Sequence, residues 1–376
     1  MDAPLTTISL GTISRNRANN AGKILRAGAQ SVSPEEYQLA IDTAQAWRDQ
    51  HIEATQECFS EVLKCSNYFA ESVCTYRLKR IASIIRKLQR AQTHLKLGEL
   101  DDIGGCRLIL ETNNQVRQAA EILKSQIPLK KGSGEKDYIL NPQKSGYRSR
   151  HLLFKPETQT GSYQVEVQIR TQLQHYWATA VEAAGEIYGT EYKSPEVRRQ
   201  AVGPEDQERI QFFQIVSSLF ALEEGAPQVP GFERSQKELV KELQTLECSS
   251  CLLDDLAAST DSIFPLNPPT DKAATLFLLK LSREDQLLDI ESFRQDQLSE
   301  ALQKYGDLED RIEAATNKGT EFEYNNVVLV YAQNHEQLSI AYPNYSANVS
   351  HFVDKVGEYL QSVSYTHLRA HETELH

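Results

Sequence analysis

The segment Asp137–Phe154 places an aromatic ring and three candidate anion-binding side chains directly after a glycine. It reads DYILNPQKSGYRSRHLLF, so Tyr147 is followed by Arg148, Arg150 and His151. The Asn-Pro and Ser-Gly pairs are typical of turns. Turn formation gives no reason for a bulky ring and cationic groups at the same place, so the sequence favours a loop that holds a ligand.

Lys79, Ser83 and Lys87 recur four residues apart in RLKRIASIIRKL. On a helix, which the sequence predicts over about residues 72–92, these three side chains would share one face. A small serine between two lysines leaves room for a phosphate group. An ordinary amphipathic surface helix has the same spacing, so both interpretations stay open.

The segment ELDDIGGCRLILE sets two carboxylates, Asp101 and Asp102, in front of a Gly-Gly pair and an apolar, strand-like run. Such residues are common in a turn between a helix and a strand. A carboxylate at the entrance of a strand is also well placed to hold a divalent metal together with nucleotide phosphates. The segment alone does not decide between a turn and a metal site.

The segment YQVEVQIRT alternates apolar and polar side chains. On a strand, every second residue from Val165 to Ile169 would face one way, whereas Glu166, Gln168 and Arg170 would face the other. A half-exposed strand and the polar floor of a binding site both produce this alternation.

These candidate residues belong to a region in which strand-like and helical segments alternate. Ser33 and Pro34 mark the start of a helix that we expect to reach about Lys64. The runs CRLILE, HLLFKP and YQVEVQIRT are strand-like, and helical periodicity lies between and after them. The pattern predicts an α/β or α+β domain.

The length of 376 residues is enough for about two domains. In the last third we expect strands near 274–281, 287–293 and 327–332 and helices near 295–315 and 347–361. The expected units are a loose N-terminal arm (1–32), a main domain (33–200), a helical region (201–263), a small acidic α+β domain (264–363) and a non-native tail (364–376).

The charge of the chain is uneven. Residues 1–200 carry 27 Lys and Arg against 22 Asp and Glu, a net +5, whereas residues 201–376 carry 13 against 30, a net −17. The first part can therefore meet anionic ligands. No apolar run approaches the ~20 residues of a membrane span, the N-terminus lacks a secretory pattern, and six cysteines in so long a chain do not resemble a disulfide framework. We expect a cytoplasmic protein without membrane contact.

Four motifs follow one another over about residues 70–192: RLKRIASIIRKL, DDIGGCR, DYILNPQKSGYRSRH, and VEVQIRT followed by HYWA. This succession closely resembles the synthetase domain of the RelA/SpoT family. The resemblance implies a mixed-sheet, nucleotidyltransferase-like fold. It also implies transfer of a pyrophosphate group from ATP to the 3′-hydroxyl of GDP or GTP, which makes the alarmones ppGpp and pppGpp of the stringent response.

The family's hydrolase domain depends on a His-Asp dipeptide, which this sequence does not contain. The resemblance therefore implies a synthetase-only GTP diphosphokinase of the small alarmone synthetase kind.

The resemblance assigns residues to the donor, ATP. Arg77 and Arg107 match the arginines that sandwich the adenine ring, on which flat guanidinium groups stack well. Lys79, Ser83 and Lys87 match the residues that hold the ATP phosphates.

Two carboxylates are assigned to the chemistry. Asp102 matches a metal ligand, and Glu166 matches the glutamate that helps to hold Mg²⁺ and activates the acceptor hydroxyl. Mg²⁺ is therefore the expected cofactor.

The acceptor is assigned to the glycine-containing loop and its surroundings. Tyr147 matches the tyrosine that stacks on guanine, His151 the histidine beside the acceptor's phosphates, and His175 a histidine near the guanine. The other expected acceptor-binding residues are Lys144, Arg148 and Gln168.

One position departs from the family pattern, because Gln143 stands where a lysine is usual and Lys144 carries the charge one residue later. In an extended loop this shift points the charge to the other side, so the acceptor's identity stays open. A toxin-like relative would instead modify the 3′ end of tRNA or make adenosine alarmones. A non-catalytic nucleotide sensor is the third alternative, but a sensor needs neither Asp102 nor Glu166.

The acidic residues 201–363 contain no motif that we can name. Regulation by a protein partner, homo-oligomerisation and autoinhibition are the roles left open for them.

Overall fold

The computed structural model describes residues 12–90, 94–132, 134–193, 203–259, 264–266, 271–282, 285–318, 320, 322–332 and 349–361. The tail expected at 364–376 lies outside these residues.

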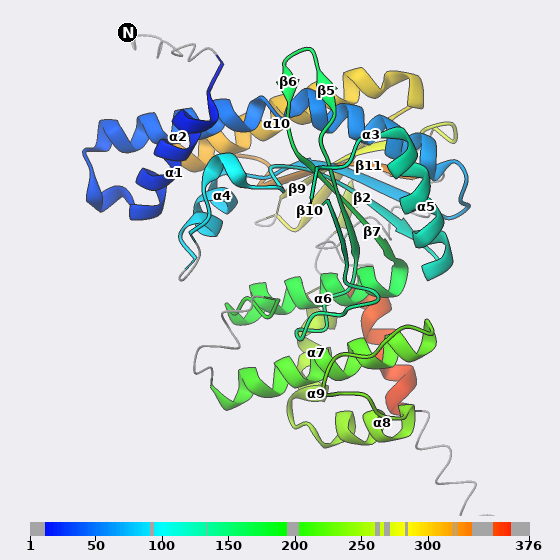
Figure 1. Ribbon diagram of the computed structural model, residues 1–376. Coiled ribbons are helices and arrows are strands. Elements are labelled where there is room, and N and C mark those ends of the chain that lie inside the picture. The colour runs from blue at the N-terminus through cyan, green and yellow to red at the C-terminus, as the bar shows by residue number, and fades with distance from the viewer. Residues whose placement is uncertain are drawn as a thin grey trace, which may run out of the picture.

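A single mixed β-sheet of nine strands organises the described part of the chain (Figure 1), in the order β3-β4-β7-β2-β1-β11-β9-β10-β8. The neighbours β2 and β7 run parallel, as do β10 and β8, and the other pairs are antiparallel. The strands are β1 (Val73–Leu78), β2 (Gly104–Leu110), β3 (Glu135–Asp137), β4 (Arg150–Phe154), β7 (Val165–Thr171), β8 (Phe264–Leu266), β9 (Leu276–Ser282), β10 (Leu287–Phe293) and β11 (Asn326–Ala332). A separate hairpin pairs β5 (Glu157–Thr158) with β6 (Gly161–Ser162).

One face of the sheet is covered by α3 (Ile52–Ser66), α5 (Asn113–Gln126) and α10 (Leu298–Lys318). Apolar residues of these helices pack on alternate residues of the strands, among them Leu108 and Val167. This main core includes residues of β9 and β11 as well as of β2 and β7. One continuous core therefore runs from the first third of the chain to the last.

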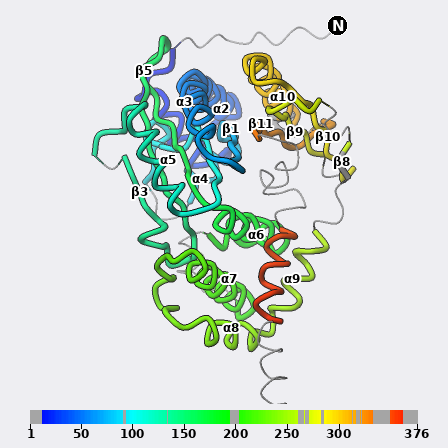
Figure 2. The backbone as a smooth tube through the Cα atoms, turned by 90° about the vertical axis from the view of Figure 1, so that its right-hand side faces the viewer, coloured from blue at the N-terminus to red at the C-terminus, as the bar shows by residue number. Residues whose placement is uncertain are grey.

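A helical bundle lies on the other side of the sheet, as the turned view in Figure 2 shows. Its members bury a second core. They are α6 (Gln172–Tyr188), α7 (Pro204–Glu223), α8 (Gln236–Thr245), α9 (Cys248–Ala258) and a helix over residues 349–361.

The remaining helices form a third cluster, in which α1 (Arg15–Ala27), α2 (Pro34–Asp49) and α4 (Ile81–Leu88) pack around apolar residues such as Leu25 and Ile84. Short 3₁₀ turns lie at η1 (Ala29–Ser31), η2 (Leu97–Glu99) and η3 (Gln295–Gln297).

Three expectations about local structure differ from the structure. The arm expected at 1–32 contains α1, which begins at a Ser14 cap and packs on α2. The single helix expected over 33–64 is divided into α2 and α3 near His51. The helix expected over 72–92 is the strand β1 followed by the shorter α4. Pairing with β2 and β11 fixes residues 73–78 as a strand, and tertiary pairing outweighs local helical spacing.

The last third contains the expected kinds of element, with β9, β10, β11, α10 and the helix at 349–361 close to the expected ranges. They do not form a separate sheet, however. Strand β11 pairs with β1, so residues expected in a domain of their own extend the sheet of the main domain. The mixed α/β fold class is confirmed.

Candidate active site

Polar side chains of four neighbouring strands lie on the sheet face opposite the main core. The strand register sets Arg107 of β2 between Thr75 of β1 and Gln168 of β7, and Gln168 beside His151 of β4. In β7, the alternation predicted from the sequence is present, because Val165, Val167 and Ile169 are in the core and the polar residues face away from it. The strands therefore present a continuous polar row.

The two predicted catalytic carboxylates come from neighbouring positions at the adjacent parallel strands β2 and β7. Glu166 lies on β7 opposite Gly105, the second residue of β2, and Asp102 lies two residues before β2 begins. Both line the same cavity, of about 440 Å³, with the predicted donor residues Arg77, Lys79 and Ser83.

Asp102 is held by two lysines. The Nζ atoms of Lys79 and Lys87 each lie 2.8 Å from its Oδ2. Burial disfavours the charge of Asp102, but the two ammonium groups outweigh it and hold the pKa of Asp102 well below its usual range. Lys79 precedes α4 and Lys87 lies within it, so the two lysines meet at one anion although they do not share one helix.

Glu166 belongs to a chain of hydrogen bonds that leads to the aromatic ring of the loop. Its Oε1 accepts from His151 Nδ1 at 3.0 Å, and Tyr147 Oη lies 2.8 Å from Nε2 of the same imidazole. Because an ionised carboxylate can only accept, Nδ1 is the donor to Glu166, and the tyrosine hydroxyl lies within hydrogen-bond distance of Nε2 on the other side of the ring. The other oxygen of Glu166 accepts from Gln168 Nε2 at 2.7 Å.

The pKa of Glu166 reflects these contacts. Burial opposes its ionisation, but the hydrogen bond from His151 holds the pKa of Glu166 below its ordinary value of 4.5. Glu166 is therefore ionised at neutral pH and can accept a proton there.

Three arginines, Arg77, Arg107 and Arg170, lie close enough to one another to interact electrostatically. Burial and the neighbouring Arg170 and Arg77 lower the pKa of Arg107 to about 9. Its Nε has no hydrogen-bond partner among the described residues. Guanidinium groups gathered in this way cost free energy unless an anion or a stacking surface meets them, so the cluster favours an anionic, aromatic ligand.

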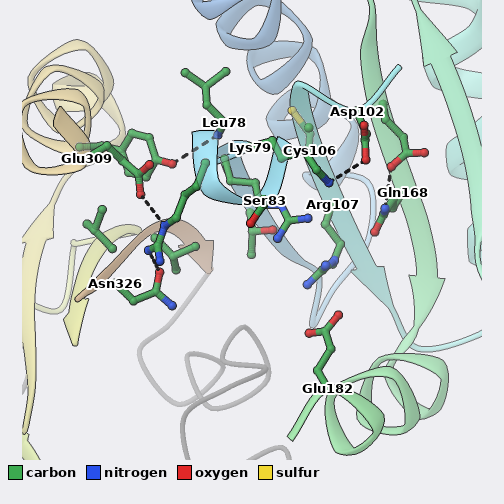
Figure 3. Close-up of a pocket in the computed structure, with 18 of the residues that line it drawn as sticks. Leu78, Lys79, Ser83, Asp102, Cys106, Arg107, Gln168, Glu182, Glu309 and Asn326 are labelled. Carbon is green, nitrogen blue, oxygen red and sulfur yellow. Dashed lines mark hydrogen bonds and ion pairs between the residues drawn. The ribbon is translucent and has the colours of Figure 1, made fainter. Parts of the chain in front are cut away.

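Glu182 of α6 approaches this cluster from the helical bundle, as Figure 3 shows. Its Oε1 lies 2.7 Å from Lys193 Nζ. Burial opposes its charge, but Lys193 and Arg107 hold the pKa of Glu182 at about 2. Lys193 also lies 5.8 Å from the centre of the Tyr147 ring, which links the arginine cluster to the loop.

The carboxylates fit a magnesium ion that is shared with a substrate. Oδ1 of Asp102 is buried without a hydrogen-bond partner among the described residues. Those residues contain no group of three or more His, Cys, Asp or Glu side chains that could hold a metal alone. Mg²⁺ is commonly bound by one or two carboxylates plus substrate phosphates and water, and Asp102 and Glu166 suit this mode.

Not every predicted site residue joins the cavity. Arg148 is 2% exposed and donates from Nε to Ser217 of α7 at 3.0 Å, so its guanidinium lies against the bundle. His175 of α6 is buried and contacts Arg170. Lys144 is exposed, and its carbonyl accepts from Gln214 of α7 at 2.6 Å.

Arg150, a candidate anion-binding group from its place in the loop, pairs with Glu135 of β3 instead, with 2.6 Å from Nε to Oε1. Gly146 serves the backbone of the loop. It has a φ of +95°, and a Cβ atom there would lie 2.8 Å from Trp177 and 2.9 Å from Ser217.

Several cavity residues were not found from the sequence. Arg80, Arg86, Glu182 and Glu186 lie within or next to the recognised motifs, but their spacing carries no signal. A further group comes from the last third of the chain, namely Tyr305, Glu309, Asn325, Asn326, Val327 and Val328.

None of the helices in the described ranges is long and apolar enough to cross a lipid bilayer.

Residues 76–193 match the family model RelA_SpoT, described as a region found in RelA / SpoT proteins. The chain therefore contains a RelA_SpoT domain at these residues. Strands β8–β11, helix α10 and the bundle helices α7–α9 lie beyond the matched segment.

The curated relatives are GTP pyrophosphokinases. The chain is 34% identical over 110 residues to GTP pyrophosphokinase YjbM of Bacillus subtilis, covering 28% of this chain and 52% of that protein. It is 37% identical over 102 residues to a probable chloroplastic GTP diphosphokinase, RSH2, of rice, covering 27% of this chain and 13% of the relative. The match thus spans about half of the bacterial relative and a small part of the plant protein.

Solved structures with similar chains include small alarmone synthetase 1 from Bacillus subtilis, at 23% identity and a TM-score of 0.38, covering 48% of this chain and 94% of that one. The same synthetase bound to its product pppGpp matches at 24% identity and a TM-score of 0.37, covering 47% and 91%.

Proposed function

We propose that this protein is a GTP diphosphokinase that transfers a pyrophosphate group from ATP to the 3′-hydroxyl of GDP or GTP. The observation that carries the proposal is the pair Asp102 and Glu166, one just before β2 and one on the adjacent β7, in a cavity whose lining includes Arg77, Lys79 and Arg107. The RelA_SpoT match over residues 76–193 and the GTP pyrophosphokinase relatives support it.

In this proposal the donor lies over β1 and β2. Arg77 and Arg107 would hold the adenine ring between their guanidinium planes. Lys79, Ser83 and Lys87 would meet the phosphates, and the phosphates would then take the place that Asp102 has beside the lysines. Asp102 is thereby freed for a cation.

The acceptor lies over β4 and β7. Tyr147 offers its ring to the base, and His151 and Gln168 face the same space from neighbouring strands. Lys136 of β3 lies opposite His151 in the register and is exposed. Arg148 and Arg150 are engaged elsewhere, and both ring nitrogens of His151 are used by Glu166 and Tyr147, so we assign the acceptor's phosphates to Lys136.

The reaction forms a bond between the acceptor's 3′-oxygen and the β-phosphorus of ATP, and it breaks the bond between that phosphorus and the oxygen that bridges to the α-phosphate. AMP leaves with the bridging oxygen. The proton of the 3′-hydroxyl passes to Glu166, whose alignment by His151 and Gln168 keeps an oxygen lone pair directed at the acceptor. Positioning the two nucleotides in line supplies much of the remaining rate enhancement.

Asp102 and Glu166 would hold Mg²⁺, which neutralises charge on the transferred phosphates. Arg107 and Lys79 stabilise the same charge from the protein side.

The proposed activity is that of a synthetase, and the sequence printed above contains no His-Asp dipeptide of the kind on which the family's hydrolase domain depends. We place the protein in the cytoplasm with its nucleotide substrates.

A label-transfer experiment tests the proposal. The full chain is incubated with γ-labelled ATP, Mg²⁺ and an equal mixture of GDP, GTP, ADP and deacylated tRNA. We expect the label mainly in ppGpp and pppGpp, with AMP formed in equal amount. Label found chiefly in tRNA or in an adenosine polyphosphate would show that the acceptor is not GDP or GTP. Absence of any transfer would contradict the enzymatic function.

A further inference from the structure

Three successive residues lie at the donor end of the cavity, namely Leu78, Lys79 and Arg80. All three are bound, directly or through Arg48, by groups from the last third of the chain. The backbone N–H of Leu78 donates to the hydroxyl of Tyr305 at 3.3 Å. The carbonyl of the next residue, Lys79, accepts from Arg48 Nε at 3.0 Å. Arg48 in turn donates from a terminal nitrogen to Glu309 Oε2 at 3.0 Å. The backbone of the phosphate-binding lysine is thus tied, directly and through Arg48, to α10.

Arg80, the third of these residues, has its partners among the described residues in the same region. Its Nε lies 3.7 Å from Glu309 Oε1, and one terminal nitrogen donates to the carbonyl of Asn325 at 3.2 Å. The other terminal nitrogen donates to the side-chain oxygen of Asn326. Figure 3 shows Glu309 and Asn326 on one side of the cavity, across from Asp102 and Gln168.

Glu309 brings a carboxylate, only 5% exposed, to the wall of a site that would receive a triphosphate. An unpaired negative charge there would repel the donor. Arg48 and Arg80 bracket it from two sides, so its charge is balanced within the wall. The carboxylate is therefore placed to orient cations and not to bind a ligand of its own.

These contacts lie outside the segment that matches the family model. Tyr305, Glu309 and Asn325–Val328 line the cavity, whereas the match ends at residue 193. Since β11 pairs with β1 along Val73–Tyr76, the added strand continues the floor of the site beyond Arg77. Sites that position reacting groups need such a supporting shell, because small displacements cost much of the rate.

We propose that α10 and β11 form a wall of the donor-nucleotide subsite, in which Glu309 and Asn326 are positioning residues for Arg80 and the backbone of Lys79. This inference rests on the proposed function, in which ATP is the donor. It goes beyond that function by making the region after the RelA_SpoT match a part of the donor site.

Asn326 provides the sharpest test, because it is only half-buried and its replacement leaves the core intact. Asn326→Ala removes one acceptor from Arg80. A hydrogen bond of this kind contributes about 0.5–1.5 kcal/mol, so we expect affinity for a non-hydrolysable ATP analogue to fall about two- to tenfold. The KM for ATP rises in parallel, and the KM for GDP or GTP stays at the parent value.

Two further variants separate positioning from a general loss of stability. Asn326→Gln keeps an uncharged amide oxygen for Arg80 and should restore ATP-analogue binding to near the parent level. Glu291→Gln removes a carboxylate from the same region, where it pairs with Lys304 away from the cavity. It should leave nucleotide binding unchanged.

The experiment measures analogue binding by calorimetry, the two KM values and the thermal unfolding midpoint for all four proteins. Unchanged analogue binding in Asn326→Ala, or an equal loss in Glu291→Gln, would overturn the donor-wall inference while leaving the proposed function intact. A parent protein that binds no ATP analogue would overturn both.

Discussion

The imidazole of His151 and the carboxylate of Glu166 lie 3.0 Å apart across the antiparallel pair β4 and β7. The two residues are not directly opposite in the register, because His151 pairs with Gln168 and Leu153 with Glu166. The diagonal contact allows one imidazole to reach both the carboxylate and the Tyr147 hydroxyl. It links the group that would take the proton to the group that would hold the acceptor base.

Replacements of Tyr147 should separate its ring from its hydroxyl. Tyr147→Ala removes the stacking surface, worth about 1–3 kcal/mol for a base, and should raise the KM for the acceptor accordingly. Tyr147→Phe keeps the ring and removes only the contact with His151, so the acceptor KM should stay near the parent value. Steady-state kinetics with varied GTP measure both. Equal acceptor KM values for the two variants would contradict the stacking role.

The ion pairs of Asp102 predict a pH-dependent contribution to stability. Lys79 and Lys87 hold the pKa of folded Asp102 below 3.8, the ordinary value that it has in the unfolded chain. Its ionised form therefore stabilises the fold above pH 3.8 and loses this effect as the pH falls through the lower folded pKa. Urea unfolding should show a wide stability gap between parent and Asp102→Asn at pH 7 that closes in acid.

Asp101→Asn is the matched control for that measurement. The neighbouring carboxylate pairs with Lys130 at 2.7 Å in a more exposed position. Pairs of that kind contribute about 0–1 kcal/mol, so its gap should be small throughout. A gap for Asp102→Asn that does not change with pH would show that its lysine contacts do not stabilise the fold.

The two adjacent glycines at the start of β2 should respond differently to alanine. A Cβ at Gly104 would lie 2.0 Å from Thr55 Oγ1 of α3, in the main core, and overpacking of this kind costs about 1–3 kcal/mol. A Cβ at Gly105 meets nothing closer than 3.7 Å and projects from the cavity floor beside Glu166. Gly104→Ala should lower the unfolding free energy, whereas Gly105→Ala should keep it and weaken ATP-analogue binding. The reverse pattern in denaturation and binding would refute this assignment.

A chain truncated after Tyr192 should not fold. It lacks β11, which leaves the polar backbone edge of β1 unpaired. It also lacks α7, against which Trp177 donates to the carbonyl of Phe213 at 2.7 Å. This expected result is the opposite of what autoinhibition by the acidic region predicts, since removal of an autoinhibitory region would make the truncated chain more active. Circular dichroism and size-exclusion chromatography should show an unfolded or aggregated product, and a soluble, active fragment would contradict the shared core.

Local patterns in the sequence predicted the parts of the site that depend on strand alternation. The period of two in residues 163–171 identified the face of Glu166 and Gln168 because that face is a property of the strand itself. The structural setting of Lys79 could not be predicted from the local pattern. That pattern predicts a helix over residues 73–78, but pairing of β1 on both sides makes these residues a strand. The metal and catalytic roles of Asp102 and Glu166 stay predictions.

The positions of the other site residues depend on packing between segments that are far apart in the sequence. Arg148 follows the loop tyrosine directly and was expected at the acceptor, but α7 draws its guanidinium to Ser217. Glu309 is 261 residues from its partner Arg48, and no periodicity or motif connects positions so far apart. The wall formed by α10 and β11 could therefore be recognised only from the folded chain.

Glu166→Gln tests the central claim most directly. The amide keeps the shape of the side chain but cannot take the acceptor's proton. The measurement is the rate of label transfer from γ-labelled ATP to GDP or GTP, with ATP-analogue binding and thermal unfolding measured on the same preparations. We predict that transfer falls by about 10²- to 10⁴-fold, while binding and unfolding stay close to the parent. Transfer within tenfold of the parent would contradict the role of Glu166.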